Sequence, residues 1–584
     1  MAHRDHWCGE VLDHLIGHRI QVAGWVHRRR DHGGLVFIDL RDRTGILQLV
    51  ISEDRDPQVH ATGQMLRNEY VVAAAGEVVA RSPERVNPKL ATGMVELLVE
   101  RLQILAAAQT PPFFPEDQLE IDETLRLKYR YIDLRRPRMY RNLLLRHRVV
   151  QAVRRYLEAQ GFIEVETPIL TKSTPEGARD FLVPCRLQPG EFYALPQSPQ
   201  LFKQLLMVGG FERYYQIARA FRDEDLRADR QPEHTQIDLE MSFVDEADLQ
   251  EIVEGMWAAA FRETLGVTLA RPFPRLSYRE AMARYGSDKP DLRFGMEIVD
   301  VSDLAGGIDF RIFQEALARG GTVRGLRAER GGGLSRREVE ELGAQLEDFG
   351  LGGLLPLWVE AGGVRSPLVK HAGPELVESI VARLQGQPGD LLLLAAGPVA
   401  NVEPGLGALR LSLAAKLGIE RSGWAFAWVV DFPMFEYDAV EKRLKAQHHP
   451  FTKPRIEDLS DLKTKPLALG TYAYDLVLNG VELGSGSLRI SEPELQQAVF
   501  EALGLTEEEI QAKFGFLVEA MKYGAPPHGG IGLGLDRAVM LMAGESSIRD
   551  VIAFPKTQSG SCPLTEAPSP VSAEQLRELR IRTF

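Results

Sequence analysis

Hydrophobic and polar residues alternate along the first part of the chain in five short runs, which Gly, Asp and Pro residues separate. A two-residue period is the pattern of a β-strand with one buried face. The runs are "RIQVAGWVHR", "LVFIDLRD", "ILQLVIS", "YVVAAAGEVVA" and "GMVELLVERLQIL". Five strands of this length within residues 1–108 predict a small β-barrel of the OB type.

Beyond this barrel the pattern changes. "AQTPPFFPEDQ" is rich in proline, so we place a linker or hinge over residues 109–135. A helical segment and then "GFIEVETPIL" open a core over residues 136–289, and the proline near the end of that strand predicts a sheet edge or a strand end. The β pattern resumes with "WAFAWVVDFPMF" in the second part of the core, residues 421–584.

Glycine is frequent between residues 290 and 420, in stretches such as "RGGTVRGLRAERGGGLS". Ser335 and Glu338 have the spacing of a capping box, which predicts the start of a helix. The strand-like runs "LLPLWVE" and "GDLLLLAAG" flank another helical stretch. We therefore expect an inserted α+β domain with its own small core, and we see no catalytic constellation in it.

Composition narrows the class of protein. The chain has 584 residues, of which 44% are hydrophobic and 26% charged, as in an ordinary globular protein with several domains. Its cysteines, Cys8, Cys185 and Cys562, lack metal-ligand spacing, so neither a zinc site nor a disulfide framework is expected. The N-terminal residues lack the apolar core of a signal peptide, and the longest apolar runs are too short to span a bilayer. We expect a cytoplasmic enzyme.

The formal net charge of −13 by itself argues against a nucleic-acid partner, but the distribution of charge changes that picture. Residues 126–148 hold nine Lys and Arg residues and one acid, Asp133, and "HRRRD" at residues 27–31 is a second basic cluster. Such runs are most often solvated helix faces. Two of them on an acidic chain still indicate a local track for a polyanion.

One strand of the predicted barrel carries an aromatic residue on its polar face. By the two-residue period, "LVFIDLRD" places Phe37, Asp39 and Arg41 together, opposite its apolar residues. A ring between charges suits stacking on the bases of single-stranded nucleic acid. The alternative is that Phe37 packs under a loop, and the adjacent "RRRD" favours RNA.

The stretch "YDLVLNGVELGSGSLR" predicts a hairpin with two carboxylates on one face. Its Asn-Gly pair is the strongest short signal for a type I′ turn. With that turn Val477 faces Glu482, and Asp475 lies on the same face as Glu482, one diagonal away. Two such carboxylates suit a hard divalent cation such as Mg²⁺ that is shared with phosphate oxygens. The alternative is that both carboxylates belong to the polar outer face of the hairpin.

Two arginines far apart in sequence suit the same polyanionic ligand. In "GGIGLGLDRAVMLM", Gly532 and Gly534 resemble a dinucleotide fingerprint, but Arg537 stands where the third glycine belongs. We interpret this stretch as a glycine-rich strand that leads into a helix, with Arg537 reaching phosphate. In "FRDEDLRADRQPEHTQIDLEMSF", Arg222 precedes a run of acids. The two arginines could hold a triphosphate from two sides, with Mg²⁺ on the hairpin carboxylates between them.

These stretches together resemble a known family. "GFIEVETPIL", "FRDEDLRADRQPEHTQIDLEMSF" and "GIGLGLDRAVML" are similar to motifs 1, 2 and 3 of class II aminoacyl-tRNA synthetases. With "RDHGGLVFIDLRDR", "STPEGARDF", "QSPQLFKQ" and "AQHHPFT", the chain resembles bacterial aspartyl-tRNA synthetases over nearly its whole length. The resemblance implies a multidomain α+β protein with an antiparallel core sheet flanked by helices, ATP and Mg²⁺ as cofactors, and a homodimer joined through motif 1. The implied reaction converts L-aspartate and ATP to aspartyl-adenylate and then esterifies the terminal adenosine of tRNA(Asp) at its 3′-hydroxyl.

The motifs of the family carry over to positions in this chain. Arg222 and Arg537 are implied as the catalytic arginines. The implied ATP site consists of Arg222, Asp223, Glu224, Gln231, Glu482, Gly534, Leu535, Asp536 and Arg537. The implied aspartate site consists of Glu176, Gln200, Leu201, Phe202, Lys203, Arg222, Asp238, His448 and Arg489. The implied metal ligands are Asp475 and Glu482.

The residue types of the aspartate site suit its implied ligand. Lys203 and Arg489 are two cations for a side-chain carboxylate, and Glu176 and Asp238 offer acceptors for an ammonium group. Asparagine would leave Arg489 without a charged partner, which is costly in a desolvated site. We expect the two histidines of "AQHHPF" on opposite faces of a strand, so that only one, His448 by the resemblance, contacts substrate.

By the same resemblance the barrel binds the anticodon, with Phe37 as the stacking residue and Arg30 and Gln48 as contacts to base edges or backbone. His32 stands in a loop where strict tRNA(Asp) enzymes often have leucine. Histidine there is associated with relaxed enzymes that also aspartylate tRNA(Asn). An imidazole can hydrogen-bond a base that leucine only packs against.

Two other functions remain as alternatives. An AMP-forming asparagine synthetase can use the same catalytic core, but it would need neither the barrel nor the basic region. A non-enzymatic RNA-binding relative typically loses motif arginines or metal carboxylates, whereas Arg222, Arg537, Asp475 and Glu482 are all present in this chain.

Overall fold

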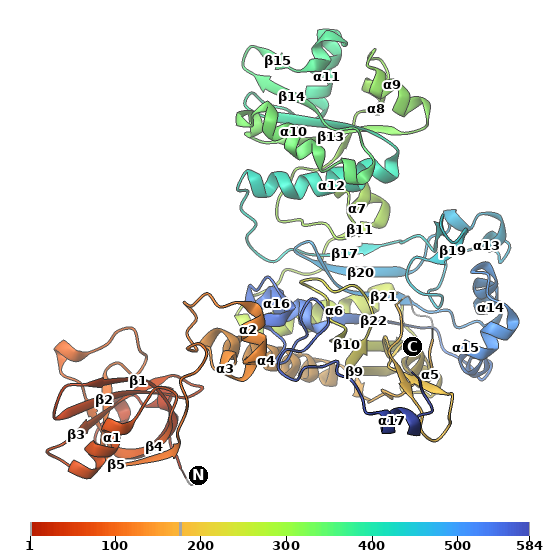
Figure 1. Cartoon of the computed structure of the whole chain (residues 1–584). Helices are drawn as coiled ribbons and strands as arrows, with labels where there is room; N and C mark the ends of the chain where they lie inside the picture. Colours follow the sequence, from red (N-terminus) through yellow and green to blue (C-terminus); the bar gives the residue numbers. More distant parts are fainter. Residues whose placement is uncertain (1–2, 175–177, 583–584) are drawn as a thin grey trace. The chain divides into compact units, whose positions relative to one another are not determined.

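The computed structural model describes residues 3–174 and 178–582. Its internal contacts divide the chain into two compact units, which we describe separately (Figure 1). The first unit comprises Met1–Arg146 and Arg549–Pro570, and the second comprises His147–Ile548 and Val571–Phe584. No helix within the described ranges is long and apolar enough to cross a membrane.

Five strands close a barrel in the first unit (Figure 1). They are β1 (Arg19–Asp31), β2 (Leu35–Arg41), β3 (Ile46–Ser52), β4 (Val71–Ala80) and β5 (Val95–Ala106). The order around the barrel is β1-β2-β3-β5-β4, antiparallel except for the pair β3–β5, and α1 (Pro57–Met65) lies in the connection from β3 to β4. A closed five-stranded barrel is what the alternating pattern predicted.

The alternation along β2 separates the core of the barrel from its outer face. Val36, Ile38 and Leu40 are completely buried, whereas Phe37 and Asp39 are partly exposed. Arg41 departs from the expected polar face, because it is buried and donates to the Glu69 carboxylate at 2.9 Å. Arg135 of the linker donates to the same carboxylate at 2.7 Å. Arg41 therefore serves the packing of the barrel.

The basic run of residues 126–148 folds into helices. They are α2 (Glu123–Lys128), α3 (Arg130–Asp133) and the first part of α4 (Pro137–Ala159). Some of its cations are exposed, among them Lys128, Arg141 and Arg148. Others are buried, so the run is more than a solvated helix face.

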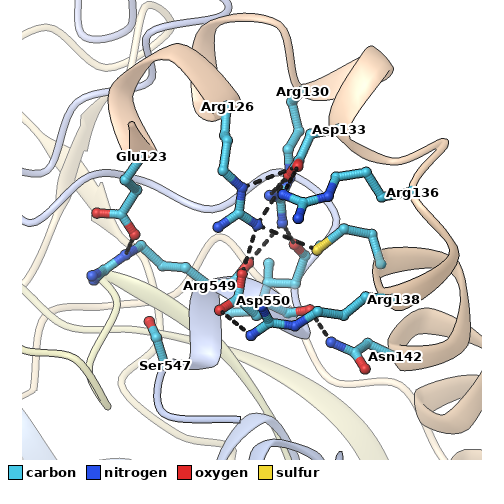
Figure 2. Close-up of polar contacts among 12 residues, drawn as sticks. Glu123, Arg126, Arg130, Asp133, Arg136, Arg138, Asn142, Ser547, Arg549 and Asp550 are labelled. Carbon is cyan, nitrogen blue, oxygen red and sulfur yellow. Dashed lines mark hydrogen bonds and ion pairs between the residues drawn. The ribbon is translucent and has the colours of Figure 1, made fainter. Parts of the chain in front are cut away.

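Three arginines of this run surround its single acid, as Figure 2 shows. Asp133 is completely buried. It accepts hydrogen bonds from Arg126 at 3.0 Å, from Arg130 at 2.5 Å and from Arg136 at 3.4 Å. A buried carboxylate is stable only when it is paired, so these contacts hold the carboxylate and the arginines together.

The same arginines fasten a segment from the other end of the chain (Figure 2). Arg126 lies 2.8 Å from the Asp550 carboxylate, 424 residues later in sequence. Arg130 donates to three backbone carbonyl oxygens within residues 549–553. We call the resulting ion-pair network the hinge cluster; its members are Arg126, Arg130, Asp133, Arg136 and Asp550.

The core of the second unit is an eight-stranded sheet with the order β11-β17-β20-β21-β22-β10-β9-β6 (Figure 1). The strands are β6 (Ile163–Glu164), β9 (Arg213–Phe221), β10 (Glu233–Ser242), β11 (Arg275–Ser277), β17 (Phe426–Val430), β20 (Ala473–Leu478), β21 (Val481–Leu488) and β22 (His528–Gly534). Neighbours are antiparallel except at the two edges, where β11–β17 and β6–β9 are parallel. The strand of motif 1 thus lies at a sheet edge, as its proline predicted.

Helices and two small hairpins accompany this sheet. The helices are α5 (Gln200–Val208), α6 (Glu246–Leu265), α7 (Tyr278–Tyr285), α13 (Asp461–Thr464), α14 (Pro493–Ala502), α15 (Glu507–Met521), α16 (Leu535–Ala543) and α17 (Ala573–Glu578). The hairpins pair β7 (Leu182–Pro184) with β8 (Phe192–Ala194) and β18 (Phe435–Asp438) with β19 (Arg443–Ala446). Helix α5 packs on β9 and β10, and α16 continues directly from β22, as the glycine-rich stretch predicted.

The turn between β20 and β21 has the geometry that its sequence predicted. Its Asn-Gly pair has φ values of 55° and 82°, the left-handed pair of a type I′ turn. Val477 faces Glu482, as expected. A bulge beside Val477 then shifts the register by one residue, so that Asp475 faces Ser485.

The inserted domain contains a second sheet, with the order β12-β13-β16-β14-β15. Its strands are β12 (Val299–Asp300), β13 (Thr322–Ala328), β14 (Leu355–Glu360), β15 (Gly363–Arg365) and β16 (Leu391–Gly397). Its helices are α8 (Ser302–Ala305), α9 (Arg311–Ala318), α10 (Arg336–Ala344), α11 (Pro374–Arg383) and α12 (Val399–Lys416). Alternate residues of β16 enter two separate hydrophobic clusters, so this domain has two cores, where one small core was expected. Ser335 and Glu338 form the predicted capping box at α10.

The inserted domain meets the core where α12 passes α7. A β-carbon at Gly407 of α12 would lie 2.5 Å from the carbonyl oxygen of Gly286, so only glycine allows this approach. Gly286 ends α7 with a left-handed φ of 65°. Arg410 is buried beside this crossing and donates to backbone carbonyl oxygens of residues 291–296.

Removal of the buried carboxylate of the hinge cluster should destabilise the first unit. Asp133→Ala leaves three arginines without their shared partner, and breaking a buried ion pair in this way costs about 3–5 kcal/mol. We expect faster hydrogen exchange of the backbone amides of α2 and α3, measured by mass spectrometry.

The matched control is Asp303→Ala, which removes an exposed ion pair with Arg383, a kind of pair that contributes little to stability. Exchange in α2 and α3 should be unchanged in this control. If the Asp133 variant also showed unchanged exchange there, the hinge cluster would not be a source of stability.

Candidate active site

One cavity of about 420 Å³ opens on the sheet of the second unit. Strands β10, β21 and β22, helices α5 and α16, and the loops around residues 222–231 and 448–449 supply its walls. Its lining includes these residues expected from the sequence: Gln200, Lys203, Arg222, Glu224, Gln231, Asp238, His448, Glu482, Gly534, Asp536, Arg537 and Arg489. Side chains from distant parts of the sequence therefore meet in one cavity.

Other expected residues lie elsewhere. Within the described ranges, those that do not line the cavity are Leu201, Phe202, Asp223, Leu535 and Asp475. Leu201 and Leu535 are buried without lining the cavity, and Leu201 belongs to a hydrophobic cluster. Asp223 is exposed, and its carboxylate lies 3.5 Å from Arg179. Glu176 lies outside the described residues.

A buried group of four charged residues forms one end of the site, and we call it the charge cluster. Its members are Lys203, Asp238, Glu240 and Arg489, each at most 2% exposed. Lys203 Nζ lies 2.9 Å from Asp238 and 3.2 Å from Glu240. Arg489 donates through Nε and Nη2 to the two oxygens of Glu240, at 2.9 and 3.2 Å. Two cations balance two carboxylates, which allows all four to be buried.

The two acids of the charge cluster ionise differently. Burial opposes the ionisation of Glu240, but the charges of Arg489 and Lys203 outweigh it and lower the pKa of Glu240 to about 2. Burial raises the pKa of Asp238, and Lys203 offsets this only in part. Asp238 Oδ2 has no hydrogen-bond partner in the described part of the chain. A cationic ligand group at this oxygen would stabilise the carboxylate, so Asp238 is suited to accept from an ammonium ion.

Both histidines of "AQHHPF" line the cavity, so the expectation that only one faces it is wrong. They lie in a loop, where the alternation of a strand does not apply. His448 Nε2 lies 3.3 Å from Asp475, and His449 Nε2 accepts from Arg489 Nη1 at 2.6 Å. Burial and then the charge of Arg489 lower the pKa of His448 to about 4 and hold the pKa of His449 well below its usual value, so both rings are neutral near pH 7.

A second part of the cavity contains Arg222, Arg537 and His234. Arg537 donates to the carbonyl oxygen of Glu482 at 3.1 Å and lies 3.3 Å from the Asp229 carboxylate. Arg222 Nε is buried and has no hydrogen-bond partner among the residues described. Burial and then the charges of Arg222 and Arg537 lower the pKa of His234 to about 3. The two arginines share one cavity, as a triphosphate held from two sides requires.

Asp475 and Glu482 interact, as the hairpin pattern predicted. Asp475 is buried, and its burial and then the charge of Glu482 raise its pKa well above the usual range. A cation beside both carboxylates would relieve this repulsion. Residues 3–174 and 178–582 contain no group of three or more His, Cys, Asp or Glu side chains placed to hold a metal ion. Two carboxylates nevertheless fit Mg²⁺, which usually takes its remaining ligands from phosphate and water.

Sequence reasoning missed several residues of the site. They are Ser198, His234, Gln236, Glu240, His449 and Ser485. The two-residue period along β10 places His234, Gln236 and Glu240 on the same face as Asp238, so this signal could have identified them. His449 carried no comparable signal, because the direction of a loop side chain depends on what packs around it.

The expected tRNA-binding residues gather on one face of the barrel in the first unit. Arg30 faces Phe37 across β1 and β2, with its guanidinium carbon 5.9 Å from the centre of the ring. Arg30 also donates to Asp39 at 2.9 Å and to Gln48 at 3.0 Å. The ring of His32 meets that of Phe37 edge-on, with 5.7 Å between centres. Phe37 remains partly exposed among polar groups, which suits stacking on a base.

Two family models match the chain. The model described as tRNA synthetases class II (D, K and N) matches residues 122–558, and that of the OB-fold nucleic acid binding domain matches residues 20–105. The antiparallel sheet and the cavity shared by motif arginines agree with the first, and the closed barrel agrees with the second. The chain belongs to the class II tRNA synthetases of the D, K and N group, and the predicted fold is confirmed.

Relatives that match over the full length show which members of this group the chain resembles. The aspartate–tRNA(Asp/Asn) ligase of Moorella thermoacetica is 57% identical over 582 residues, which cover 100% of this chain and 97% of that protein. The aspartate–tRNA ligase of Geobacillus kaustophilus is 54% identical over 580 residues, which cover 99% of this chain and 98% of that protein. The resemblance to bacterial aspartyl-tRNA synthetases is thereby confirmed.

Solved structures agree on the fold. The asparaginyl-tRNA synthetase of Pyrococcus horikoshii, solved with asparaginyl-adenylate, aligns with a TM-score of 0.60 at 19% identity, over 95% of this chain and 99% of that chain. The aspartyl-tRNA synthetase of Entamoeba histolytica aligns with a TM-score of 0.56 at 19% identity, over 93% and 89% of the two chains. At such identities the likeness concerns the fold alone.

Proposed function

We propose that the protein is an ATP-dependent aspartate–tRNA ligase. L-aspartate and ATP form aspartyl-adenylate and pyrophosphate, and the aspartyl group then passes to the 3′-hydroxyl of the terminal adenosine of tRNA(Asp) while AMP leaves. The observation that carries this proposal is one cavity lined both by Lys203, Asp238 and Arg489 of the charge cluster and by the arginine pair, Arg222 and Arg537. The functions named for the full-length relatives support the choice of amino acid and tRNA.

The charge cluster suits aspartate as the amino acid. Its hydrogen bonds use four of the five N–H groups of Arg489, and the ion pairs of Lys203 with Asp238 and Glu240 engage two of its three N–H groups. One N–H on each cation therefore remains for the side-chain carboxylate of the substrate, and Asp238 Oδ2 accepts from its ammonium group. Asparagine offers no negative charge to these buried cations, so its rejection is expected to be steep.

The arginine pair suits the phosphates of ATP. Displacement at phosphorus depends mainly on positioning and on stabilisation of charge, and guanidinium groups bind two phosphate oxygens at once. Three further expected contacts, Glu224, Gln231 and the helix start at Gly534, line the same cavity. Asp475 and Glu482 would hold Mg²⁺, which supplies positive charge to the phosphate oxygens when it is bound.

Arg489→Leu should abolish the aspartate-dependent exchange of pyrophosphate into ATP. The change removes the buried cation that the substrate carboxylate needs and leaves Glu240 with Lys203 as its remaining cationic partner, so we expect a loss of about 10³-fold or more. Labelled pyrophosphate exchange, with aspartate, with asparagine and with no amino acid, measures this.

Glu482→Gln is the matched comparison, because it removes one metal ligand and leaves the charge cluster intact. Its exchange should recover in part as the concentration of Mg²⁺ is raised, whereas that of Arg489→Leu should not. Unchanged exchange in Arg489→Leu would remove this residue from the pocket. If the wild-type protein showed no aspartate-dependent exchange, the proposed function itself would be wrong.

We further propose that the barrel binds the anticodon through Arg30, Phe37 and Gln48, and that His32 permits aspartylation of tRNA(Asn) as well as tRNA(Asp). The first three side chains are within reach of one another on one face, and the rings of His32 and Phe37 pack in a T-shaped arrangement. The name "Aspartate–tRNA(Asp/Asn) ligase" of several relatives supports the relaxed specificity.

His32→Leu should lower the charging of tRNA(Asn) by about tenfold and largely spare tRNA(Asp), because leucine cannot hydrogen-bond a base.

Phe37→Ala should weaken charging of both tRNAs and leave pyrophosphate exchange intact, since loss of base stacking costs about 1–3 kcal/mol. Charging kinetics with the two purified tRNAs measure both effects. Failure of the wild-type protein to charge tRNA(Asn) would refute the relaxed specificity, and equal losses of charging and exchange in Phe37→Ala would indicate a folding defect.

We also propose that the protein is a homodimer joined through the region of motif 1. The edge strand β6, the segment that follows it and the hairpin β7–β8 carry a series of exposed apolar side chains. They are Ile163, Ile169, Leu170, Leu182, Leu187, Phe192 and Tyr193, exposed by 40% to 77%. Apolar residues concentrated in this way, next to an open sheet edge, are typical of a protein–protein interface.

Ile163→Arg should convert the dimer to a monomer, because a charge at the centre of an apolar interface is left without a partner. Analytical ultracentrifugation at micromolar protein concentration measures the mass. Leu411→Arg is the control, because Leu411 is 44% exposed on α12 of the inserted domain, and this variant should remain dimeric. A monomeric wild-type protein would contradict the proposal.

A further inference from the structure

Alternate residues of β10 form a row of functional side chains. In strand order they are His234, Gln236, Asp238 and Glu240. The first three line the cavity, and Glu240 follows them in the charge cluster. Side chains two residues apart on a strand point to the same face, so this row runs along one wall of the site.

The residues around each end of this row indicate which part of the substrate that end would contact. At one end, Glu240 orients the cations that suit the side-chain carboxylate of aspartate, and Asp238 comes next as the acceptor for its ammonium group. At the other end, His234 lies in the field of Arg222 and Arg537, the arginine pair proposed to bind the phosphates. In aspartyl-adenylate the group between the ammonium-bearing carbon and the phosphate is the carbonyl. Gln236 stands at the corresponding place in the row.

Gln236 has an unused hydrogen-bond donor at this place. The residue is 6% exposed and lines the cavity, yet its Nε2 has no hydrogen-bond partner in the described structure. Unsatisfied buried donors are uncommon, and one in the wall of a substrate cavity indicates a ligand acceptor. On the neighbouring strand a β-carbon at Gly532 would lie 3.0 Å from Gln236 Oε1, so the absence of a side chain there leaves room for the carboxamide.

We propose that Gln236 is a catalytic residue that donates from Nε2 to the carbonyl oxygen of aspartyl-adenylate; the inference rests on the proposed function. In the transfer step the 3′-hydroxyl oxygen of the tRNA forms a bond to the carbonyl carbon, and the π electron pair moves onto the carbonyl oxygen. Collapse of this oxyanion breaks the bond from carbon to the phosphate oxygen. AMP leaves with that electron pair and takes up the hydroxyl proton.

The two steps of the reaction depend on this hydrogen bond differently. During transfer the carbonyl oxygen gains negative charge, so a donor already in place stabilises the transition state more than the adenylate. During activation the carboxylate of aspartate loses charge as it attacks phosphorus, so the same donor stabilises the ground state at least as much. Loss of the donor should therefore slow transfer far more than activation.

Single-turnover kinetics with Gln236→Ala test this. Transfer from preformed aspartyl-adenylate to tRNA(Asp) should slow by about 100-fold. The kcat of pyrophosphate exchange should fall less than tenfold. Gln236→Glu keeps the size of the side chain and removes the donor, so it should slow transfer at least as much. The control is Gln250→Ala, a buried glutamine of α6 that does not line the cavity, and it should transfer at the wild-type rate.

A binding measurement separates the proposed contact from a general disturbance of the site. Two inert analogues are compared by calorimetry: an aspartyl-sulfamoyl adenosine, which keeps the carbonyl, and an aspartol adenylate, which has a methylene in its place. Gln236→Ala should weaken binding of the first by about fivefold to tenfold and leave that of the second unchanged.

Three results would overturn the inference while the proposed function stands: wild-type transfer by Gln236→Ala, a rise in KM for aspartate with kcat unchanged in both steps, or equal weakening of both analogues. Uniform loss of substrate binding would produce the second result. Lack of aspartate-dependent exchange in the wild-type protein would instead refute the proposed function, so the two failures are distinguishable.

Discussion

Four buried charges that neutralise one another are the interaction on which the site depends. Lys203 comes from α5, Asp238 and Glu240 from β10, and Arg489 from the end of β21, so the charge cluster ties together three parts of the sequence. None of these charges could be buried alone, because desolvation of an unpaired ion costs several kcal/mol. The cluster therefore fixes the position of each member, and under the proposed function recognition of the amino acid rests on the few N–H groups and the one carboxylate oxygen that remain unsatisfied. Specificity in such a site follows from the donors and the acceptor that have no partner within the cluster.

Arginine has two different roles in this chain, and charge density in the sequence does not separate them. The run of residues 126–148 looks like a track for a polyanion, yet Arg126, Arg130 and Arg136 are engaged with Asp133 in the hinge cluster. Arg222, by contrast, lines a cavity with its Nε unpartnered among the described residues. What distinguishes the two cases is the presence of a buried acid within reach. That acid can come from far along the chain, as Asp550 does, so local sequence cannot reveal it.

Local regularity could be predicted from the sequence, and long-range contacts could not. The barrel, the edge position of β6, the capping box of α10 and the type I′ turn all follow from short-range rules of strand period, proline and turn chemistry. The register beyond that turn could not be predicted, because a bulge places Asp475 opposite Ser485. The prediction that only one of His448 and His449 faces the cavity failed for a similar reason. A strand was assumed where the chain forms a loop, and both rings reach the cavity. Residues of the site such as Arg489 were identified by resemblance, whereas Glu240, which orients it, required the structure.

The glycine-rich stretch of β22 has a physical explanation that its likeness to a dinucleotide fingerprint does not offer. In the antiparallel register Gly530 faces Glu240, Gly532 faces Asp238 and Gly534 faces Gln236. A β-carbon at Gly530 would lie 1.8 Å from a carboxylate oxygen of Glu240, and one at Gly532 would lie 3.4 Å from an oxygen of Asp238. The alternate glycines thus give clearance to the row of side chains on β10, with the tightest approach beside the charge cluster. Because β10 is paired on both sides, by β9 and β22, the row is held on a rigid element, as catalytic donors and acceptors require. The functional side chains of β10 recur every second residue, and the glycines of β22 that face them recur with the same spacing. The site requires both.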